Sequence, residues 1–138
     1  MRKKSSTYWK KKCDALWSDI VRQVGKCEIC HKPGLPRKDG LRVKGLEAHH
    51  LISKGANLKF RHDLSNGICL CFQHHKGNNN IAAHGANDVT TRFMEWLEAE
   101  RPGQWKWFCE NRDNKCFEKM DYESIYYELK EIFEKGKT

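Results

Sequence analysis

Cysteine and histidine are the residues of this chain whose types and spacing suggest chemistry: there are seven of each in 138 residues. An odd number of cysteines excludes a fully paired disulfide framework, and clustered thiols and imidazoles in a reduced compartment are typical of metal sites. Two short pairs stand out, Cys27-x2-Cys30 and Cys71-x2-His74. Each pair offers two ligands from one tight turn, so the spacing predicts a tetrahedral structural Zn²⁺ site.

Other residues close to these pairs compete for the same ion. Cys69 lies two residues before Cys71 and is a competing ligand. We favour Cys71, because His74 follows it by three residues, which is the better reach for a turn. His31 and His75 could also replace one of the four ligands. Without a metal, the cysteines would be ordinary buried thiols.

A second group of polar side chains lies in the same stretch, namely His49, His50, Asn66 and His75. Adjacent residues of a strand project to opposite sides, so His49 and His50 are expected to do different work, one binding a metal and the other facing a water molecule. The amide of Asn66 can orient a histidine through a hydrogen bond. Imidazoles suit a transition metal ion, or Mg²⁺ held together with phosphate oxygens.

Helices are expected at both ends of the chain. Residues 5–24 carry apolar side chains at helical spacing, and Gly25 is a suitable terminator. The same spacing predicts a helix before the break at residues 101–103, a short aromatic helix at 104–111 and a last helix from near Asp121. The three aromatic side chains of the short helix are expected in the core, with an exposed partner surface as the alternative; they are Trp105, Trp107 and Phe108.

Between the helices, residues 46–52 and 68–71 are candidates for two short strands, and residues 33–45 for a loop or an irregular hairpin. This His-rich centre has few apolar residues to hold it, so we expect a metal ion to staple it. The predicted organisation is a single α+β domain over residues 1–138, with an N-terminal helix in 1–26, a zinc-stapled centre in 27–88 and helices in 89–138.

Positive charge is concentrated in the first part of the chain. The net charge is +8, and residues 1–88 hold 17 Lys and Arg against 7 Asp and Glu, whereas residues 89–138 hold 9 against 11. This asymmetry favours a polyanionic partner at the basic part, with Lys54 as a candidate phosphate contact; a solvated surface is the alternative. With no secretory signal and no apolar run near the ~20 residues that span a bilayer, we expect a cytoplasmic protein without a membrane partner.

Taken in order, the segments LEAHHLI, LSNGICLC and FQHH resemble the motif of HNH endonucleases. In that family a strand with two adjacent histidines leads to an Asn and then to a terminal His on a helix. One subgroup also has two zinc-binding knuckles, which Cys27, Cys30 and Cys71 match, while His74 stands where the family usually has Cys. Zinc accepts that exchange. The stretch HGANDVTTRFMEWL resembles phage-type members, and the likeness covers about residues 5–100.

This resemblance implies a small ββα-metal core and a metal-dependent endonuclease that hydrolyses DNA phosphodiester bonds, nicking one strand or breaking both. His50 matches the general base that activates water, and Asn66 the residue that holds its loop. His49 and His75 match ligands of the catalytic metal, which is Mg²⁺, Mn²⁺ or a similar ion. Arg61 matches a basic residue that grips phosphate in several relatives. A phage origin and a packaging or recombination partner are implied by the resemblance alone.

A third ligand of the catalytic metal is expected, because two histidines do not fix a divalent ion. His84 lies nine positions after His75, so one helix would not place both on one face, but a loop through residues 77–80 could fold His84 back. An imidazole binds Mn²⁺ better than an amide oxygen does, and Asn66 is engaged if it holds the loop. We favour His49, His75 and His84, with Asn66 as the alternative.

A zinc-stapled DNA-binding module that does not cut is the alternative function. It would share the basic charge and the knuckles, whereas the complete set of His50, Asn66 and His75 favours the enzyme. Cutting both strands requires two active sites, so a homodimer is a further alternative, although no heptad pattern supports one.

Overall fold

The computed structural model describes residues 3–55, 57–77, 81–85, 87–116 and 118–137, with the side chains of residues 87 and 88 left out. Within these ranges the chain forms five α-helices and two small antiparallel sheets. The predicted α+β class is confirmed at this level. In the described part of the chain, no helix is both long enough and apolar enough to cross a membrane.

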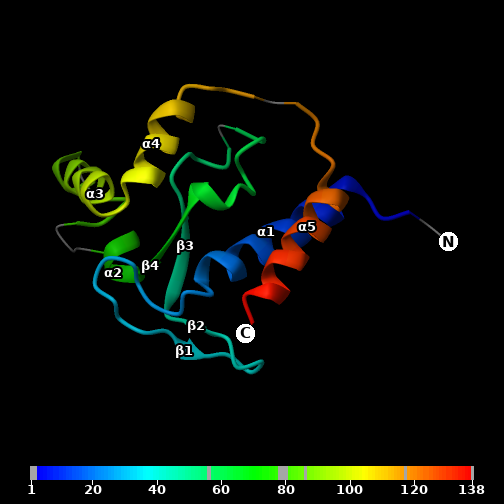
Figure 1. Cartoon of the computed structure of the whole chain (residues 1–138), viewed down its shortest axis with the longest axis horizontal. Helices are drawn as coiled ribbons and strands as arrows, with labels where there is room; N and C mark the ends of the chain where they lie inside the picture. The colour runs from blue at the N-terminus through cyan, green and yellow to red at the C-terminus, as the bar shows by residue number, and fades with distance from the viewer. Residues whose placement is uncertain (1–2, 56, 78–80, 86, 117, 138) are drawn as a thin grey trace.

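The N-terminal helix α1 (Ser6–Arg22) packs against the C-terminal helix α5 (Tyr122–Lys135), and Figure 1 shows the two side by side. Ser5 caps α1 and Asp121 caps α5, each through a side-chain oxygen that accepts a backbone N–H of the first turn. α1 ends before Val24, which is exposed and does not continue the apolar face. The contact between the helices buries Cys13, Trp17, Tyr122 and Leu129.

The central sheet consists of β3 (Leu46–His50) and β4 (Gly67–Cys71), which pair antiparallel so that His50 lies opposite Gly67. The short helix α2 (Phe72–His75) follows β4 directly. The remaining elements are the hairpin of β1 (Leu35–Pro36) and β2 (Arg42–Lys44), the 3-10 turn η1 (Leu64–Asn66), α3 (Asn87–Glu100) and α4 (Pro102–Asn111).

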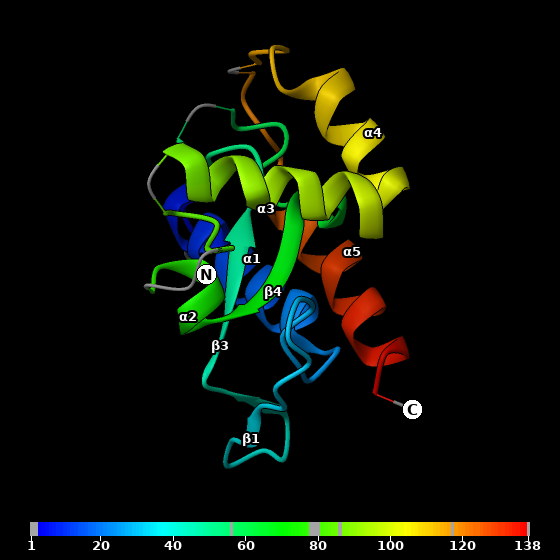
Figure 2. The same cartoon turned by 90° about the vertical axis from the view of Figure 1, so that its left-hand side faces the viewer.

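The sheet of β3 and β4 lies between helices. Figure 2 shows α3 crossing in front of the two strands and α1 behind them. Gly67 permits the close approach of α1, because a Cβ at this position would lie 2.5 Å from Val21 and 2.9 Å from the Trp17 ring. This packing brings Trp17 to the strand residue His50, which matters for the site described below.

The centre of the molecule is richer in buried apolar residues than we expected from the sequence. Strand and loop residues turn inward there and meet Phe93 and Leu97 of α3 and Phe108 of α4. The expectation that only a metal staples the centre was therefore wrong. Of the aromatic residues expected in the core, Phe108 is buried, and Trp105 and Trp107 are partly buried against the same cluster. The central residues of the cluster include Leu46, Leu51, Ile52, Phe60, Ile68 and Leu70.

Candidate active site

The first group of possible metal ligands is formed by Cys27, Cys30, Cys71 and His74, whose ligand atoms all lie within 4.8 Å of one another. The Sγ atoms of Cys30 and Cys71 are 3.8 Å apart, and Nδ1 of His74 lies 3.2 Å from Sγ of Cys71 and 3.8 Å from Sγ of Cys27. Sulfurs at the corners of a tetrahedron around zinc are about 3.8 Å apart, given Zn–S bonds of ~2.3 Å. The cluster could therefore hold a metal ion, and its donors fit zinc.

Backbone hydrogen bonds shape the turn that carries the first two of these cysteines. The N–H of His31 donates to the carbonyl of Cys27, and His31 adopts a left-handed backbone with φ 63°. Glu28 fastens the turn to β4, because its N–H donates to the carbonyl of Cys69 and its carboxylate accepts the N–H of Cys69. Arg101 donates to the other carboxylate oxygen of Glu28. The turn is thus held against the end of β4.

Two of the competing ligands lie outside this cluster. Among the described residues, the cluster includes neither Cys69 nor His31. Cys69 is fully buried, and burial together with the Glu28 carboxylate raises the pKa of its thiol to about 12. Burial of Cys27 by itself would raise the pKa of its thiol, but the backbone N–H groups around the sulfur outweigh this effect and lower that pKa. Of these two thiols, Cys27 loses its proton more readily and is therefore better suited to bind a metal as a thiolate.

The second group is a cluster of three imidazoles, from His49, His75 and His84, with ligand atoms within 4.8 Å of one another. The ring centroids are 5.0 Å apart for His49 and His75 and 4.8 Å apart for each pair with His84. His49 and His75 are buried, whereas His84 is exposed. Burial, and then the neighbouring imidazoles, lower the pKa of His49 to about 3, so this ring is neutral at physiological pH. A neutral imidazole is the form that binds a metal.

His84 reaches the other two histidines through the backbone. Its N–H donates to the carbonyl of His75, and the N–H of Ala83 donates to the carbonyl of His74. Residues 83 and 84 therefore lie against the end of α2. This position agrees with the expectation that the loop after His75 folds back and brings His84 close to it. Residues 78–80 of the intervening loop lie outside the described residues.

Glu47 belongs to the three-histidine cluster as a supporting residue and was not singled out in the sequence. Its Oε1 lies 2.6 Å from Nδ1 of His75. A carboxylate only accepts, so Nδ1 of His75 donates and Nε2 is left with its lone pair. Glu47 lies two residues before His49 on β3, on the same face of the strand. That alternation is the signal that could have identified it.

His50 occupies the opposite face of β3, against α1. Its ring stacks on Trp17, with centroids 3.9 Å apart and an interplanar angle of 14°. Its Nε2 lies 3.0 Å from the carbonyl oxygen of Arg61, which can only accept, so Nε2 carries a proton. Burial lowers the pKa of His50, against the effect of this hydrogen bond. The neutral ring therefore has its free lone pair on Nδ1.

Asn66 is fully buried, and its amide is used entirely by the backbone. Its Oδ1 accepts the N–H of Ile52, and its Nδ2 donates to the carbonyls of Ile52 and Phe60. It thereby ties the start of the loop after β3 to the end of that loop. An amide oxygen already bonded in this way is poorly placed to bind a metal, which favours His84 as the third ligand.

A cleft of about 440 Å³ is bordered by histidines from both faces of β3. His50 and the three-histidine cluster both border it, and so do the exposed side chains of Lys54 and Lys76. Lys76 is a second residue that the sequence did not single out.

Arg61 has a different environment, because its guanidinium makes a two-point ion pair with Asp14, 2.8 Å at each contact, and its side chain is only 14% exposed. The charge of Arg61 is thus already paired within the protein, and its contact with phosphate stays a prediction.

Comparison of the chain with family models, with curated proteins and with solved structures gave no match. The resemblance to HNH endonucleases therefore rests on the motif residues themselves.

Proposed function

We propose that this protein is a metal-dependent endonuclease that hydrolyses phosphodiester bonds in DNA. The observation that carries the proposal is the single cleft in which a histidine with a free Nδ1 lies beside a cluster of three imidazoles. The order of β3, β4 and α2 along the chain is also the ββα order that the HNH resemblance implies. General base, metal ligands and basic side chains are the groups that phosphodiester hydrolysis needs.

The donor set of the cluster indicates which ion would fit. His49, His75 and His84 offer three imidazole nitrogens, and Glu47 orients His75 from behind. Such a set suits Mn²⁺ or another transition ion better than Mg²⁺, which prefers oxygen ligands. When bound, a divalent ion supplies polarisation of the scissile phosphate and charge stabilisation for the leaving 3′ oxygen.

His50 would act as the general base. Its Nδ1 takes a proton from a water molecule in the cleft while the water oxygen forms a bond to phosphorus. The bond from phosphorus to the 3′ oxygen breaks, and that oxygen gains a proton from solvent, which leaves 3′-hydroxyl and 5′-phosphate ends. The hydrogen bond from Nε2 to the Arg61 carbonyl would stabilise the imidazolium that forms.

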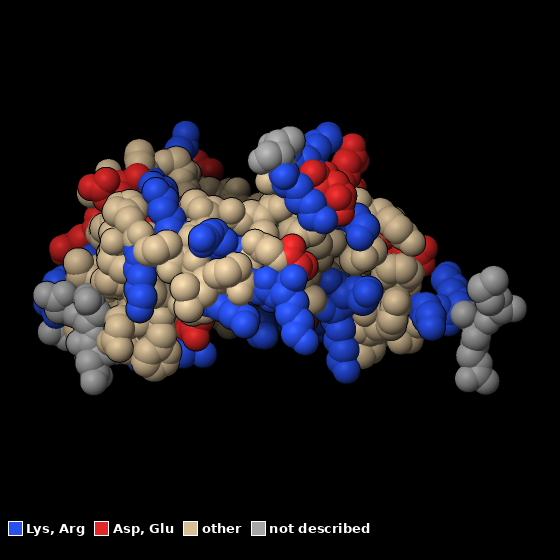
Figure 3. Space-filling view, turned by 90° about the horizontal axis from the view of Figure 1, so that it is seen from below, with Lys and Arg blue, Asp and Glu red and all other residues tan. Residues whose placement is uncertain are grey.

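The distribution of charge supports DNA as the substrate. Lys54 and Lys76 border the cleft, where they could contact phosphates on either side of the scissile bond. Figure 3 shows Lys and Arg side chains gathered along the lower edge of one face, whereas Asp and Glu lie mainly toward its upper side. A basic stripe of this kind is the electrostatic footprint of a nucleic-acid-binding protein.

Incubation of the purified protein with supercoiled plasmid tests the proposal. With Mn²⁺ we expect nicked or linear products that carry 5′-phosphates, and EDTA should abolish the reaction while structural zinc stays bound. The products should be mapped by end-labelling before and after phosphatase treatment. Binding without cleavage under all metal conditions would instead favour the zinc-stapled DNA-binding module.

A further inference from the structure

We propose that Asp14 of α1 is a positioning residue for His50, acting through Arg61. The inference rests on the proposed function, in which His50 is the general base. Asp14 lies 36 residues before His50 in the sequence, outside the motif segments LEAHHLI, LSNGICLC and FQHH. The structure nevertheless connects the two through a short series of hydrogen bonds.

Asp14 holds the segment that carries the hydrogen-bond partner of His50. Its two carboxylate oxygens accept from Nε and a terminal nitrogen of Arg61, at 2.8 Å each. Oδ1 also lies 2.6 Å from Nε2 of His62, whose side chain is only 4% exposed. One carboxylate thus fixes two consecutive residues. The carbonyl between them is the Arg61 oxygen that accepts from His50.

Trp17, one helical turn after Asp14, contacts both His50 and the 61–63 segment from a second direction. Its indole N–H donates to the carbonyl of Asp63 at 2.9 Å, and its ring stacks on His50. Residues three apart lie on one face of a helix, so Asp14 and Trp17 form one surface of α1. This surface borders, together with Ser18, a small hollow beside His50 and Lys54.

The consequence for His50 is a fixed tautomer. The Arg61 carbonyl accepts from Nε2, so the proton is held there and Nδ1 keeps its lone pair, on a residue that borders the cleft. If the 61–63 segment is released, the two neutral tautomers become closer in free energy and the ring is free to turn. Asp14 would then be needed for the orientation of the base, although it belongs neither to the lining of the cleft nor to the three-histidine cluster.

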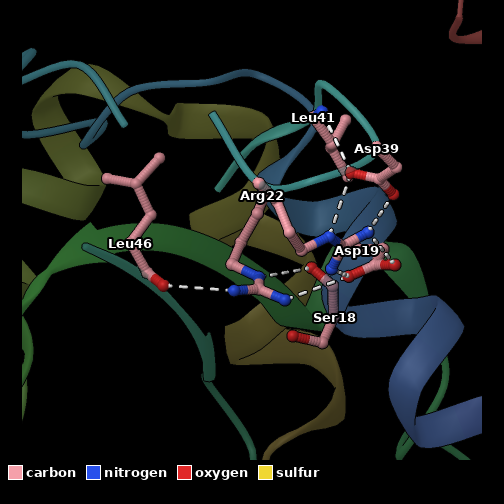
Figure 4. A network of polar contacts seen from close by, with 7 residues as sticks. Ser18, Asp19, Arg22, Asp39, Leu41 and Leu46 are labelled. Atoms are coloured by element: carbon pink, nitrogen blue, oxygen red, sulfur yellow. Dashed lines mark hydrogen bonds and ion pairs between the residues drawn. The ribbon is translucent and has the colours of Figure 1, made fainter. Parts of the chain in front are cut away.

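Asp19 offers a matched control on the same helix. It also makes a two-point ion pair, with Arg37 at 3.0 Å for each contact, and it pairs with Arg22 as well. Figure 4 shows this network, which connects α1 to the loop around Asp39 and to Leu46. Asp19→Ala therefore removes an acidic partner of arginines from α1 without touching the residues around His50.

The test compares Asp14→Ala and Asp19→Ala with the wild-type protein by long-range ¹H–¹⁵N correlation of the histidine rings, with His50 assigned through His50→Gln. We expect the Nε2–H tautomer of His50 in the wild type and in Asp19→Ala, and a mixture of tautomers in Asp14→Ala. Cleavage by Asp14→Ala should show kcat lowered roughly 10- to 100-fold, the usual effect of a supporting residue, with KM for DNA little changed. Asp14→Glu should restore part of both signals.

A pure Nε2–H signal in Asp14→Ala would overturn the inference, as would a kcat equal to that of Asp19→Ala. If Asp14→Ala does not fold, Arg61→Met removes the guanidinium, keeps the apolar stem and gives the same readout. The tautomer decides the role of Asp14 even in a protein that cuts no DNA. Absence of cleavage by the wild type would remove the proposed function and leave the positioning result standing.

Discussion

At the scale of single residues, the members of the three-histidine cluster differ in how firmly they are held. His49 is buried on a strand, His75 is fixed by Glu47, and His84 is exposed and held by its backbone. In the proposed metal site, His49 and His75 would be held in place before the ion binds, and His84 would complete the site from the exposed side. Asn66 instead supports the loop after β3.

Replacement of His84 by Ala should weaken Mn²⁺ binding while the fold is kept, because an exposed side chain is removed. We expect a loss of roughly 10-fold or more in affinity, measured by calorimetric titration or by the paramagnetic signal of Mn²⁺. His31→Ala is the matched control, since His31 is exposed and lies outside the cluster. Unchanged Mn²⁺ affinity in His84→Ala, together with a folded Asn66→Ala that loses the ion, would make Asn66 the third ligand.

The buried His49 should make the stability of the protein sensitive to acid. Its pKa is about 3 in the folded protein, and ~6.5 is usual in an unfolded chain. Between these values the unfolded chain binds a proton that the folded protein excludes, so the free energy of unfolding falls as pH is lowered through this window and is unaffected by His49 above it. From pH 7 to pH 5 the loss should be about 2 kcal/mol.

Urea unfolding of the wild type and of His49→Gln at these two pH values, without added divalent metal and with zinc content checked, measures that difference. The variant should lose about 2 kcal/mol less than the wild type on acidification. Equal losses in the two proteins would show that His49 is not kept neutral by the fold.

At the scale of elements, the knuckle around Cys27 and Cys30 is joined to β4 and α2 through the four-ligand cluster. Because the centre also has an apolar core, loss of one ligand should weaken the protein without unfolding it outright. The metal would thus increase the stability of a centre that already has an apolar core.

Cys30→Ser removes an exposed ligand and should lower zinc from one ion per chain to a weakly held fraction. We expect a fall in the thermal midpoint of about 10 °C, which corresponds to roughly 3 kcal/mol. Metal analysis and calorimetry measure both effects, with the exposed Cys109→Ser as the control that keeps its zinc. Full zinc content in Cys30→Ser would contradict the assignment of this ligand.

The elements at the two ends of the chain could be predicted well from the sequence, because apolar side chains recur there at helical spacing. The Cys and His pairs were also informative, since two ligands with two residues between them in a turn must lie close together. The contact of His84 with His75 needed a loop to fold back, and spacing alone left Asn66 open as the ligand.

Other features could not be read from local patterns. The apolar residues of the centre, such as Leu51, Ile52 and Phe60, follow no helical or strand period, so the core they form was missed. The ion pair of Asp14 with Arg61 joins residues 47 positions apart, and only packing of α1 on the sheet brings them together. The pairing of the Arg61 charge could therefore not be predicted from the sequence.

At the scale of the whole molecule, the basic charge should determine where DNA binds. Replacing Lys54 and Lys76 by Ala should weaken DNA binding and reduce the slope of log affinity against log salt by about 1 for each lysine. The same change at Lys130 and Lys135, exposed on α5, should have little effect. Fluorescence anisotropy over a salt series measures the slopes, and equal changes for the two pairs would place the DNA elsewhere.

Cleavage of supercoiled plasmid by the wild type and by His50→Ala, at saturating Mn²⁺ and DNA, tests the central claim most directly. Zinc content and DNA affinity are to be measured on the same samples, so that folding and binding are separated from chemistry. We predict that the wild type cuts, and that His50→Ala binds DNA normally but cuts roughly 10²- to 10⁴-fold more slowly, as expected for loss of a general base. Cleavage by His50→Ala at a rate close to that of the wild type would contradict the account.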